Sequence, residues 1–304
     1  MSTSQQPRVF SKPALSVGDH VALLRQRGLL IADEASARHH LTQIGYYRLS
    51  GYMLPFQKGG WGQDRHQFEA GIDFAEILDI YDFDRELRLV IMNSIERIEV
   101  AVRAAISDTM SKSYSPHWLT DPNLFEKPAE HQGILEKVKR DINPNDSRKR
   151  DVFIDHYFNS YDLPEMPPCW MVFEAMSFGT VSYLLGKLKV SHRNAISARF
   201  GVPEPVFLSW CHSLSYLRNL CAHHARVWNR TFTIKPMVSK AYTDDLTPNT
   251  RIYAQLVTMR VLLKRVSPTS SWHRDLAKLF VDHPRVTPNR VGFKPDWLNR
   301  AVWR

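Results

Sequence analysis

The sequence has few cysteines and no long apolar run. Its three cysteines, Cys169, Cys211 and Cys221, include no Cys-x-x-Cys pair. Disulfide frameworks and structural zinc sites need more cysteines at closer spacing, so we expect three reduced, buried thiols. No apolar run approaches the roughly 18 residues that span a bilayer, and residues 1–16 lack the apolar segment of a signal peptide. These absences predict a cytoplasmic protein with no membrane association.

Glycine and proline are both missing from two long stretches, residues 72–115 and 206–235. Because both residue types interrupt helices, each stretch predicts a helix. In the first stretch apolar residues recur at helical spacing and Asp73 can cap the start, which predicts one very long helix or two nearly collinear ones. The second stretch follows the breaker-rich residues 201–205 and predicts a helix over 206–230. We expect these two helices to pack nearly antiparallel.

The rest of the chain carries shorter amphipathic segments, so the fold class is expected to be all-α. The sequence has no internal repeat and no glycine-rich phosphate loop. The shorter helices are expected at residues 15–30, 33–45, 132–142, 151–161, 169–188, 249–266 and 270–282. We expect three parts: an N-terminal helical and aromatic extension (1–71), a helical core (72–235), and a basic C-terminal helical segment (236–304) that is either separate from the core or one compact unit with it.

Acidic side chains are scarce in the last hundred residues. Residues 205–304 hold 16 Lys and Arg against 5 Asp and Glu, a net charge of +11, whereas the whole chain carries +9 and the first 204 residues therefore −2. A basic surface of this kind favours a nucleic-acid partner, although a solvated surface without a dedicated partner has the same composition. The predicted RNA contacts in this part are Lys264, Arg265, Arg290 and Lys294.

The predicted helix over 206–230 has an apolar side and a polar stripe. At about 3.6 residues per turn, the stripe holds Asn219, His223, Arg226 and Arg230. Arg218 lies just beside the stripe, and its long side chain can reach toward His223. An imidazole beside several guanidinium groups suits a phosphate ester better than a protein core. This stripe is therefore the candidate functional site.

Several segments resemble a known family. The phrase RNLCAHHARVWNR at 218–230 resembles the AbiD/AbiF-like abortive-infection proteins of bacteria, as do IYDFDRELR at 80–88, SIERIEVAVR at 94–103 and HYFNSYDLPEMPPCWMVFEAMSFGTVSYLL at 156–185. Arg218 and His223, with four residues between them, also resemble the Arg-x4-His motif of the HEPN ribonuclease superfamily. The resemblance implies a HEPN-like helical bundle, a growth-arresting endoribonuclease regulated by RNA, and a homodimer in which two motifs face each other.

The residue types of the motif can perform the implied chemistry. Ribose-assisted RNA cleavage needs proton transfer at the 2′- and 5′-oxygens and stabilisation of the phosphorane. We assign acid–base work to His223, contact with the scissile phosphate to Arg218, and positioning of the imidazole to Asn219. Supporting or RNA-binding roles are expected for Arg226, Arg230, Glu99 and Arg103. The last two stand at i,i+4, where a simple intrahelical ion pair competes with a role in orienting the site.

A metal site is disfavoured by the same spacing. His223-His224 and His39-His40 are adjacent pairs, and neighbouring residues on a helix do not share a face. No carboxylate or cysteine completes a ligand set beside them, so we expect neither a metal nor another cofactor.

Two other functions stay open. The first is an RNA-binding protein that sequesters a structured noncoding RNA with little or no nuclease activity, which the basic last hundred residues fit. The second is a protein-binding helical module, for which arginines beside His223 would be unusual. The presence and length of RNA that copurifies with the protein would separate these readings.

Overall fold

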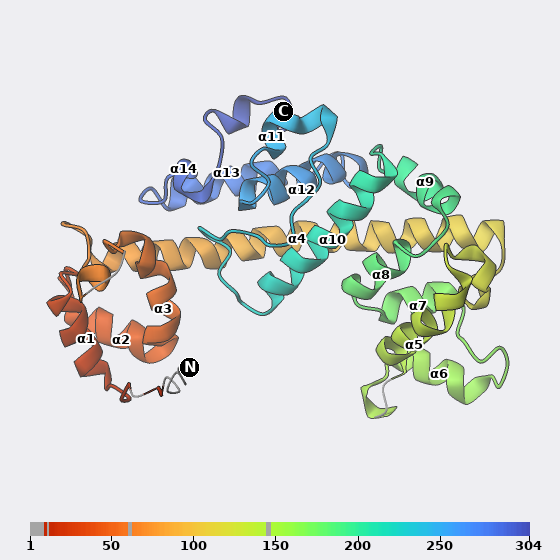
Figure 1. The fold of residues 1–304 in the computed structure, drawn as a ribbon, viewed down its shortest axis with the longest axis horizontal. Helices are drawn as coiled ribbons and strands as arrows, with labels where there is room; N and C mark the ends of the chain where they lie inside the picture. The colour runs from red at the N-terminus through yellow and green to blue at the C-terminus, as the bar shows by residue number, and fades with distance from the viewer. Residues whose placement is uncertain (1–8, 11, 60–62, 144–146) are drawn as a thin grey trace, which may run out of the picture. The chain divides into compact units, whose positions relative to one another are not determined.

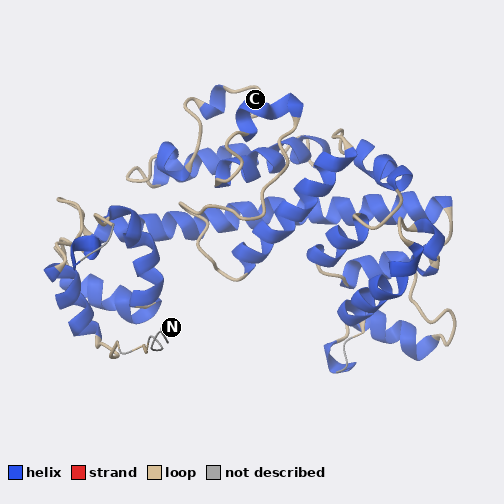
Figure 2. Ribbon diagram, in the orientation of Figure 1, coloured by secondary structure: helices blue, strands red, loops and turns tan. Residues whose placement is uncertain are grey.

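The computed structural model describes residues 9–10, 12–59, 63–143 and 147–304. These residues form fourteen α-helices and eight short 3-10 helices (Figure 2). Within the described ranges there is no β-strand, only three isolated bridges between extended residues. The all-α class predicted from the sequence is confirmed.

The chain divides into two compact units, residues 1–83 and 84–304. The described residues of the first unit form α1 (Val17–Gln26), α2 (Glu34–Ile44) and α3 (Tyr46–Met53), followed by the start of α4. Asp33 caps α2 as predicted, because its carboxylate accepts the Ser36 N–H at 2.9 Å. The division of the chain into three parts stays a prediction.

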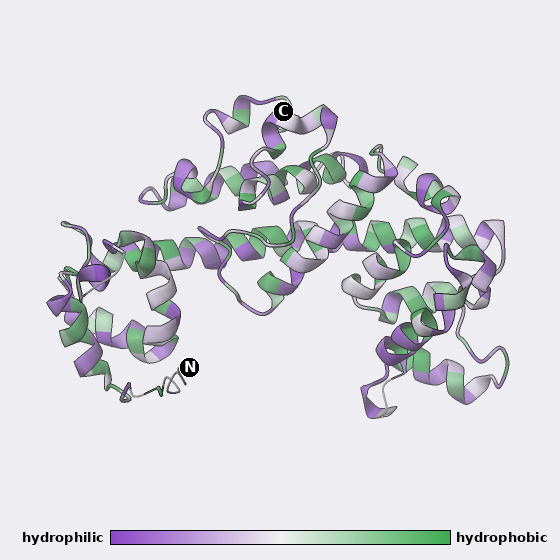
Figure 3. Ribbon diagram, in the orientation of Figure 1, coloured by the Kyte–Doolittle hydropathy of each residue, from purple (hydrophilic) through white to green (hydrophobic). Residues whose placement is uncertain are grey.

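The longest element is α4 (Phe74–Ser113), a single helix of 40 residues that confirms the helix predicted over 72–115. It starts where the Asp73 carboxylate accepts the Glu76 N–H at 2.6 Å. Apolar and polar residues alternate along it at helical spacing (Figure 3). In the second unit its apolar side is buried, with Ile91, Ile98 and Ile106 fully inside. This helix therefore forms the base on which the second unit packs.

The second unit continues with nine further helices up to residue 282 and a last short one after it (Figure 1). The expected helix over 169–188 is interrupted after Ala175, and the Ser177 hydroxyl caps a new helix by accepting the Thr180 N–H at 3.2 Å. The helices are α5 (His131–Ile142), α6 (Val152–Ser160), α7 (Cys169–Ala175), α8 (Phe178–Leu185), α9 (Val190–Ala198), α10 (Glu204–Ala222), α11 (Thr243–Leu246), α12 (Ile252–Val266), α13 (Trp272–Asp282) and α14 (Pro288–Val291).

The segment from α9 to the end of α10 runs along α4 in the opposite direction. Arg199, just after α9, pairs with Asp108 at 2.9 Å. Arg218 on α10 lies 3.8 Å from Glu99, which precedes Asp108 on α4. Beyond α10, the backbone reaches Asp84 at the first residue of the unit. As the residue numbers increase from Arg199 to Val227, the residue numbers of their partners on α4 decrease, so the two segments are antiparallel.

The C-terminal helices form a tightly buried group. Nearly every side chain of α12 is buried, and the guanidinium of Arg260 donates to the carbonyls of Trp303 and Arg304 at 3.3 Å. Trp303 and Trp297 are buried as well, so both pack within the C-terminal group. The indole of Trp272 on α13 donates to the Val90 carbonyl of α4 at 2.8 Å. In the described ranges, no helix combines the length and apolarity needed to cross a membrane.

Candidate functional site

Helix α10 carries the motif of Arg218, Asn219 and His223 at its C-terminal end. The helix begins after Pro203, with proline and glutamate in its first turn, and its apolar side, which includes Trp210 and Leu217, is fully buried. The motif side chains stand away from this apolar side. Arg218 is partly exposed, and Asn219 and His223 are exposed. The buried side therefore fixes the helix while the motif faces outward.

The predicted helix over 206–230 is wrong at its C-terminal end, because α10 stops at Ala222. His224 adopts a left-handed conformation with φ of 56°. The Ala225 N–H then bonds to the Leu220 carbonyl at 2.8 Å, and the His224 N–H bonds to the Cys221 carbonyl at 3.0 Å. These are the two bonds of a Schellman motif, in which His224 stands where glycine is usual. The absence of glycine did not prevent the helix from ending.

A buried carboxylate holds the chain that follows. The Asp84 side chain is fully buried and accepts the N–H groups of Val227 at 3.1 Å and Trp228 at 2.6 Å. It also pairs with the buried guanidinium of Arg88 on the next turn of α4. Val227 and Trp228 are themselves both buried, although adjacent residues of a helix point in different directions. The helix gives way here to a segment that buries both side chains and satisfies their N–H groups.

Sequence reasoning missed Asp84 and Arg88 as residues that shape the site. A signal for them was present, since Asp84 follows Ile80 and precedes Leu87 and Ile91 at helical spacing on the apolar side of α4. A charged residue in such a position needs a partner, and Arg88 at i+4 supplies it. The two backbone acceptances come from a distant segment, so sequence alone could not show them.

The prediction that Arg226 and Arg230 share a helical stripe with His223 is therefore wrong, because both arginines lie beyond the end of α10. Arg230 folds back on α10, where its guanidinium donates to the Tyr216 hydroxyl and to the Arg226 carbonyl, both at 3.3 Å. Arg226 is partly exposed. The guanidinium of Arg230 therefore stabilises the segment after α10, and a direct role for either arginine in RNA binding stays a prediction.

Glu99 joins the motif to α4. Its carboxylate pairs with Arg103 on the same helix and lies 3.8 Å from the guanidinium of Arg218. Arg103 is nearly buried and also donates to the carbonyls of Phe173 and Glu174 at the end of α7. The intrahelical ion pair between Glu99 and Arg103 is thus present in the structure, and the same carboxylate lies beside the motif arginine. Arg103 thus ties α4 to α7, and a role for Glu99 and Arg103 in orienting the site stays a prediction.

Arg218 and Glu99 line a cavity of about 450 Å³ beside α4. Three carboxylates and two guanidinium groups line it, from Glu96, Glu99, Glu174, Arg103 and Arg218. Arg218 is the more accessible of the two arginines, with 36% of its side chain exposed against 10% for Arg103. The guanidinium of Arg218 is therefore the group in this cavity that an incoming phosphate can reach.

His223 is free for chemistry. Its ring is exposed, and within the described residues no hydrogen bond or ion pair engages it. Beside it, Arg218 donates to the side-chain carbonyl of Asn219 at 3.4 Å. Cys221 is buried, and burial together with the nearby Asp84 carboxylate raises the pKa of its thiol to about 12. Cys221 is thus unsuited to act as a nucleophile, whereas the imidazole of His223 can exchange protons with a bound substrate.

The predicted basic residues of the last hundred positions have two kinds of environment. Lys264 donates to the Ala301 carbonyl at 3.4 Å and Lys294 to the Thr247 carbonyl at 2.5 Å, so both help to hold the C-terminal segment. Arg265 and Arg290 are exposed. In the described part of the chain, no group of three or more His, Cys, Asp or Glu side chains is arranged to hold a metal ion.

Fold and site together define an all-α protein with an arginine, an asparagine and an exposed histidine at the end of one helix, next to a glutamate of a long central helix. The family model described as Abi-like protein matches residues 39–229. This range is more than half of the chain and includes α4, α10 and the segment held by Asp84. The chain belongs to the Abi-like protein family. No curated protein and no solved structure matches it.

Proposed function

We propose that this Abi-like protein is a metal-independent endoribonuclease that arrests growth in abortive infection. The observation that carries the proposal is the C-terminal end of α10, which places the guanidinium of Arg218 at an open cavity and leaves the imidazole of His223 exposed and unpaired among the described residues. Imidazole and guanidinium are the groups that ribose-assisted cleavage needs. Membership of the Abi-like family supports the biological setting.

In the proposed reaction, His223 removes the proton of a ribose 2′-hydroxyl, and the 2′-oxygen forms a bond to the adjacent phosphorus. The guanidinium of Arg218 stabilises the phosphorane. The bond from phosphorus to the 5′-oxygen then breaks, and this oxygen gains a proton from an imidazolium. The products are a 2′,3′-cyclic phosphate and a 5′-hydroxyl, so protons and electrons balance without a metal or a cofactor.

The reaction type can be tested with purified protein and a single-stranded RNA substrate. Cleavage is expected to persist in excess chelator and to stop when the scissile nucleotide is 2′-deoxy, because the nucleophile is the 2′-oxygen. Mass spectrometry of the products should show 2′,3′-cyclic phosphate ends. Cleavage that stops with chelator and returns with magnesium would contradict the metal-independent mechanism.

We also infer a homodimer, because one imidazole serves two proton transfers poorly and the motif occurs once in the chain. Two copies of His223 facing each other would divide the roles of base and acid. Analytical ultracentrifugation of the RNA-free protein at micromolar concentration should give the mass of two chains. A protein that remains strictly monomeric in this experiment and still cleaves RNA would exclude a composite site.

A second candidate function, RNA binding without cleavage, is favoured by the net charge of +11 on residues 205–304. RNA affinity is expected to fall steeply with salt, since each neutralised phosphate releases a condensed counterion. Replacing the exposed Arg265 by alanine should lower the slope of log K against log salt by about one if it contacts a phosphate. Affinity measured by fluorescence anisotropy at several salt concentrations checks this. A flat salt dependence would argue against a phosphate-dominated interface.

A further inference from the structure

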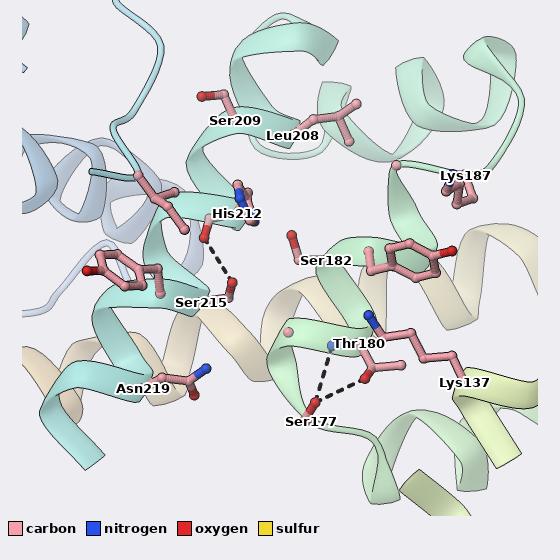
Figure 4. A pocket seen from close by; sticks show the side chains of 15 residues that line it. Lys137, Ser177, Thr180, Ser182, Lys187, Leu208, Ser209, His212, Ser215 and Asn219 are labelled. Atoms are coloured by element: carbon pink, nitrogen blue, oxygen red, sulfur yellow. Dashed lines mark hydrogen bonds between the residues drawn. The ribbon is translucent and has the colours of Figure 1, made fainter. Parts of the chain in front are cut away.

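A second cavity of about 730 Å³ lies in the same unit, between α5, α8 and α10 (Figure 4). Asn219 of the motif lines this cavity, so the cavity adjoins the candidate site. Its size falls in the range of pockets that hold small organic ligands. The lining contains Lys137, Lys187 and His212, and no aspartate or glutamate is among the described residues that line it. A cavity of this composition favours an anion.

An aromatic ring holds the two lysine ammonium groups in place. Lys137 Nζ lies 4.0 Å from the ring centroid of Tyr183, and Lys187 Nζ lies 5.3 Å from it. Lys187 also donates to Glu130 at 3.0 Å, but no described carboxylate lies within ion-pair distance of Lys137. A cation–π contact orders an ammonium group without neutralising its charge, and it is weak enough to be exchanged for a phosphate. The pair therefore forms an available positive site.

The wall of α10 leads from this positive site to the motif. His212, Ser215 and Asn219 follow one another at helical spacing, and Figure 4 shows them along the same side of the helix. His212 and Asn219 are seven residues apart, which corresponds to about 10 Å along the helix axis. Both side chains are exposed and can hydrogen-bond to a ligand.

A serine hydroxyl faces them from α8. Ser182 is only 8% exposed, and in Figure 4 its hydroxyl is directed toward α10. Ser182 lines the cavity, so its hydroxyl is open to water there and can form a hydrogen bond with a ligand that displaces that water. This hydroxyl adds a hydrogen-bonding group to the wall of the cavity that is separate from the two lysines.

We propose that this cavity binds one nucleotide of the RNA strand next to the scissile phosphate. Its phosphate lies at Lys137 and Lys187, and its ribose and base contact Ser182 and His212. This inference rests on the proposed ribonuclease function, and it assigns to α5 and α8 the task of holding the substrate while the end of α10 performs the chemistry. The strand passes Asn219 between the two.

The test measures RNA binding in a variant that carries His223→Ala, which prevents cleavage. A single-stranded RNA of about ten nucleotides is labelled and followed by fluorescence anisotropy. Adding Lys137→Ala and Lys187→Ala together is expected to weaken binding about tenfold or more, since each removes a charge-assisted hydrogen bond. The matched control, Lys139→Ala, removes an exposed lysine of α5 that does not line the cavity. It should change the affinity by less than about twofold if site-specific contacts dominate. Lys137→Arg with Lys187→Arg should restore binding.

The same RNA with 4-thiouridine gives a readout of position. Crosslinks are expected on residues of α8 and α10 that line the cavity, and they should disappear in the double alanine variant. An equal loss of affinity in Lys139→Ala, or crosslinks that map elsewhere, would overturn the assignment of the cavity. The proposed function would still stand in that case if the unmodified protein cleaves RNA. Absence of both binding and cleavage would overturn both. If a free mononucleotide binds as tightly as the RNA, the ligand is not a strand and the proposal is wrong.

Discussion

Replacing His223 by alanine is expected to slow RNA cleavage by about 10²–10⁴-fold, the usual contribution of a positioned acid–base group. The ring is exposed and makes no described hydrogen bond, so folding should be unaffected and the melting temperature unchanged. Initial cleavage rates of a labelled RNA, measured with folded protein of both forms, check this prediction.

The neighbouring histidine offers a matched control. His224 has a φ of 56° and occupies the position of a Schellman motif that glycine prefers. His224→Gly therefore removes an imidazole without straining the backbone and should leave the cleavage rate close to that of the parent protein. Equal losses in the two variants would mean that the end of α10, and not the imidazole of His223, is what matters. Unchanged cleavage in His223→Ala would favour RNA binding without nuclease activity.

Replacing Asp84 by alanine is expected to lower the stability of the second unit by about 3–5 kcal/mol, the usual effect of removing one partner from a buried ion pair. The variant leaves the guanidinium of Arg88 buried without its carboxylate, and it removes the acceptor of the Val227 and Trp228 N–H groups. Chemical denaturation followed by tryptophan fluorescence measures the loss.

Asp108→Ala is the control for this experiment. Asp108 lies on the same helix and also forms ion pairs, with Lys112 and Arg199, but its side chain is 41% exposed. Water solvates exposed charges, so the change in stability should be much smaller than for Asp84. A loss in Asp84→Ala no larger than in Asp108→Ala would contradict the view that the buried carboxylate holds the segment after α10.

The sequence was sufficient for the elements that depend on local pattern. The 40 residues of α4 follow from helical spacing without glycine or proline, and Asp73 marks their start. Arg218, Asn219 and His223 could be predicted as a candidate site because their spacing places them at one end of a helix, where the structure has them. The i,i+4 spacing of Glu99 and Arg103 likewise predicted the ion pair that the structure contains.

The features that the sequence did not reveal depend on contacts between distant segments. The end of α10 required a histidine in a left-handed conformation and an acceptor, Asp84, that lies 143 positions before Val227. Glu99 on α4 contacts Arg218 on α10, and the cavity with Lys137 is formed by the three helices α5, α8 and α10. The spacing of residues within one helix carries no information about contacts between distant segments, so these contacts are seen only in the packed structure.

In the proposed reaction, the guanidinium of Arg218 already has the Glu99 carboxylate beside it, at 3.8 Å, when the substrate phosphate arrives. A phosphate must exchange places with a carboxylate that the buried Arg103 holds still. A simple monovalent anion gains little binding free energy from such an exchange, whereas an RNA strand bound at several points has other contacts that offset its cost. Under the proposed function, we therefore expect the Glu99 carboxylate to compete with the substrate phosphate for Arg218, and to disfavour small anions more than an RNA strand.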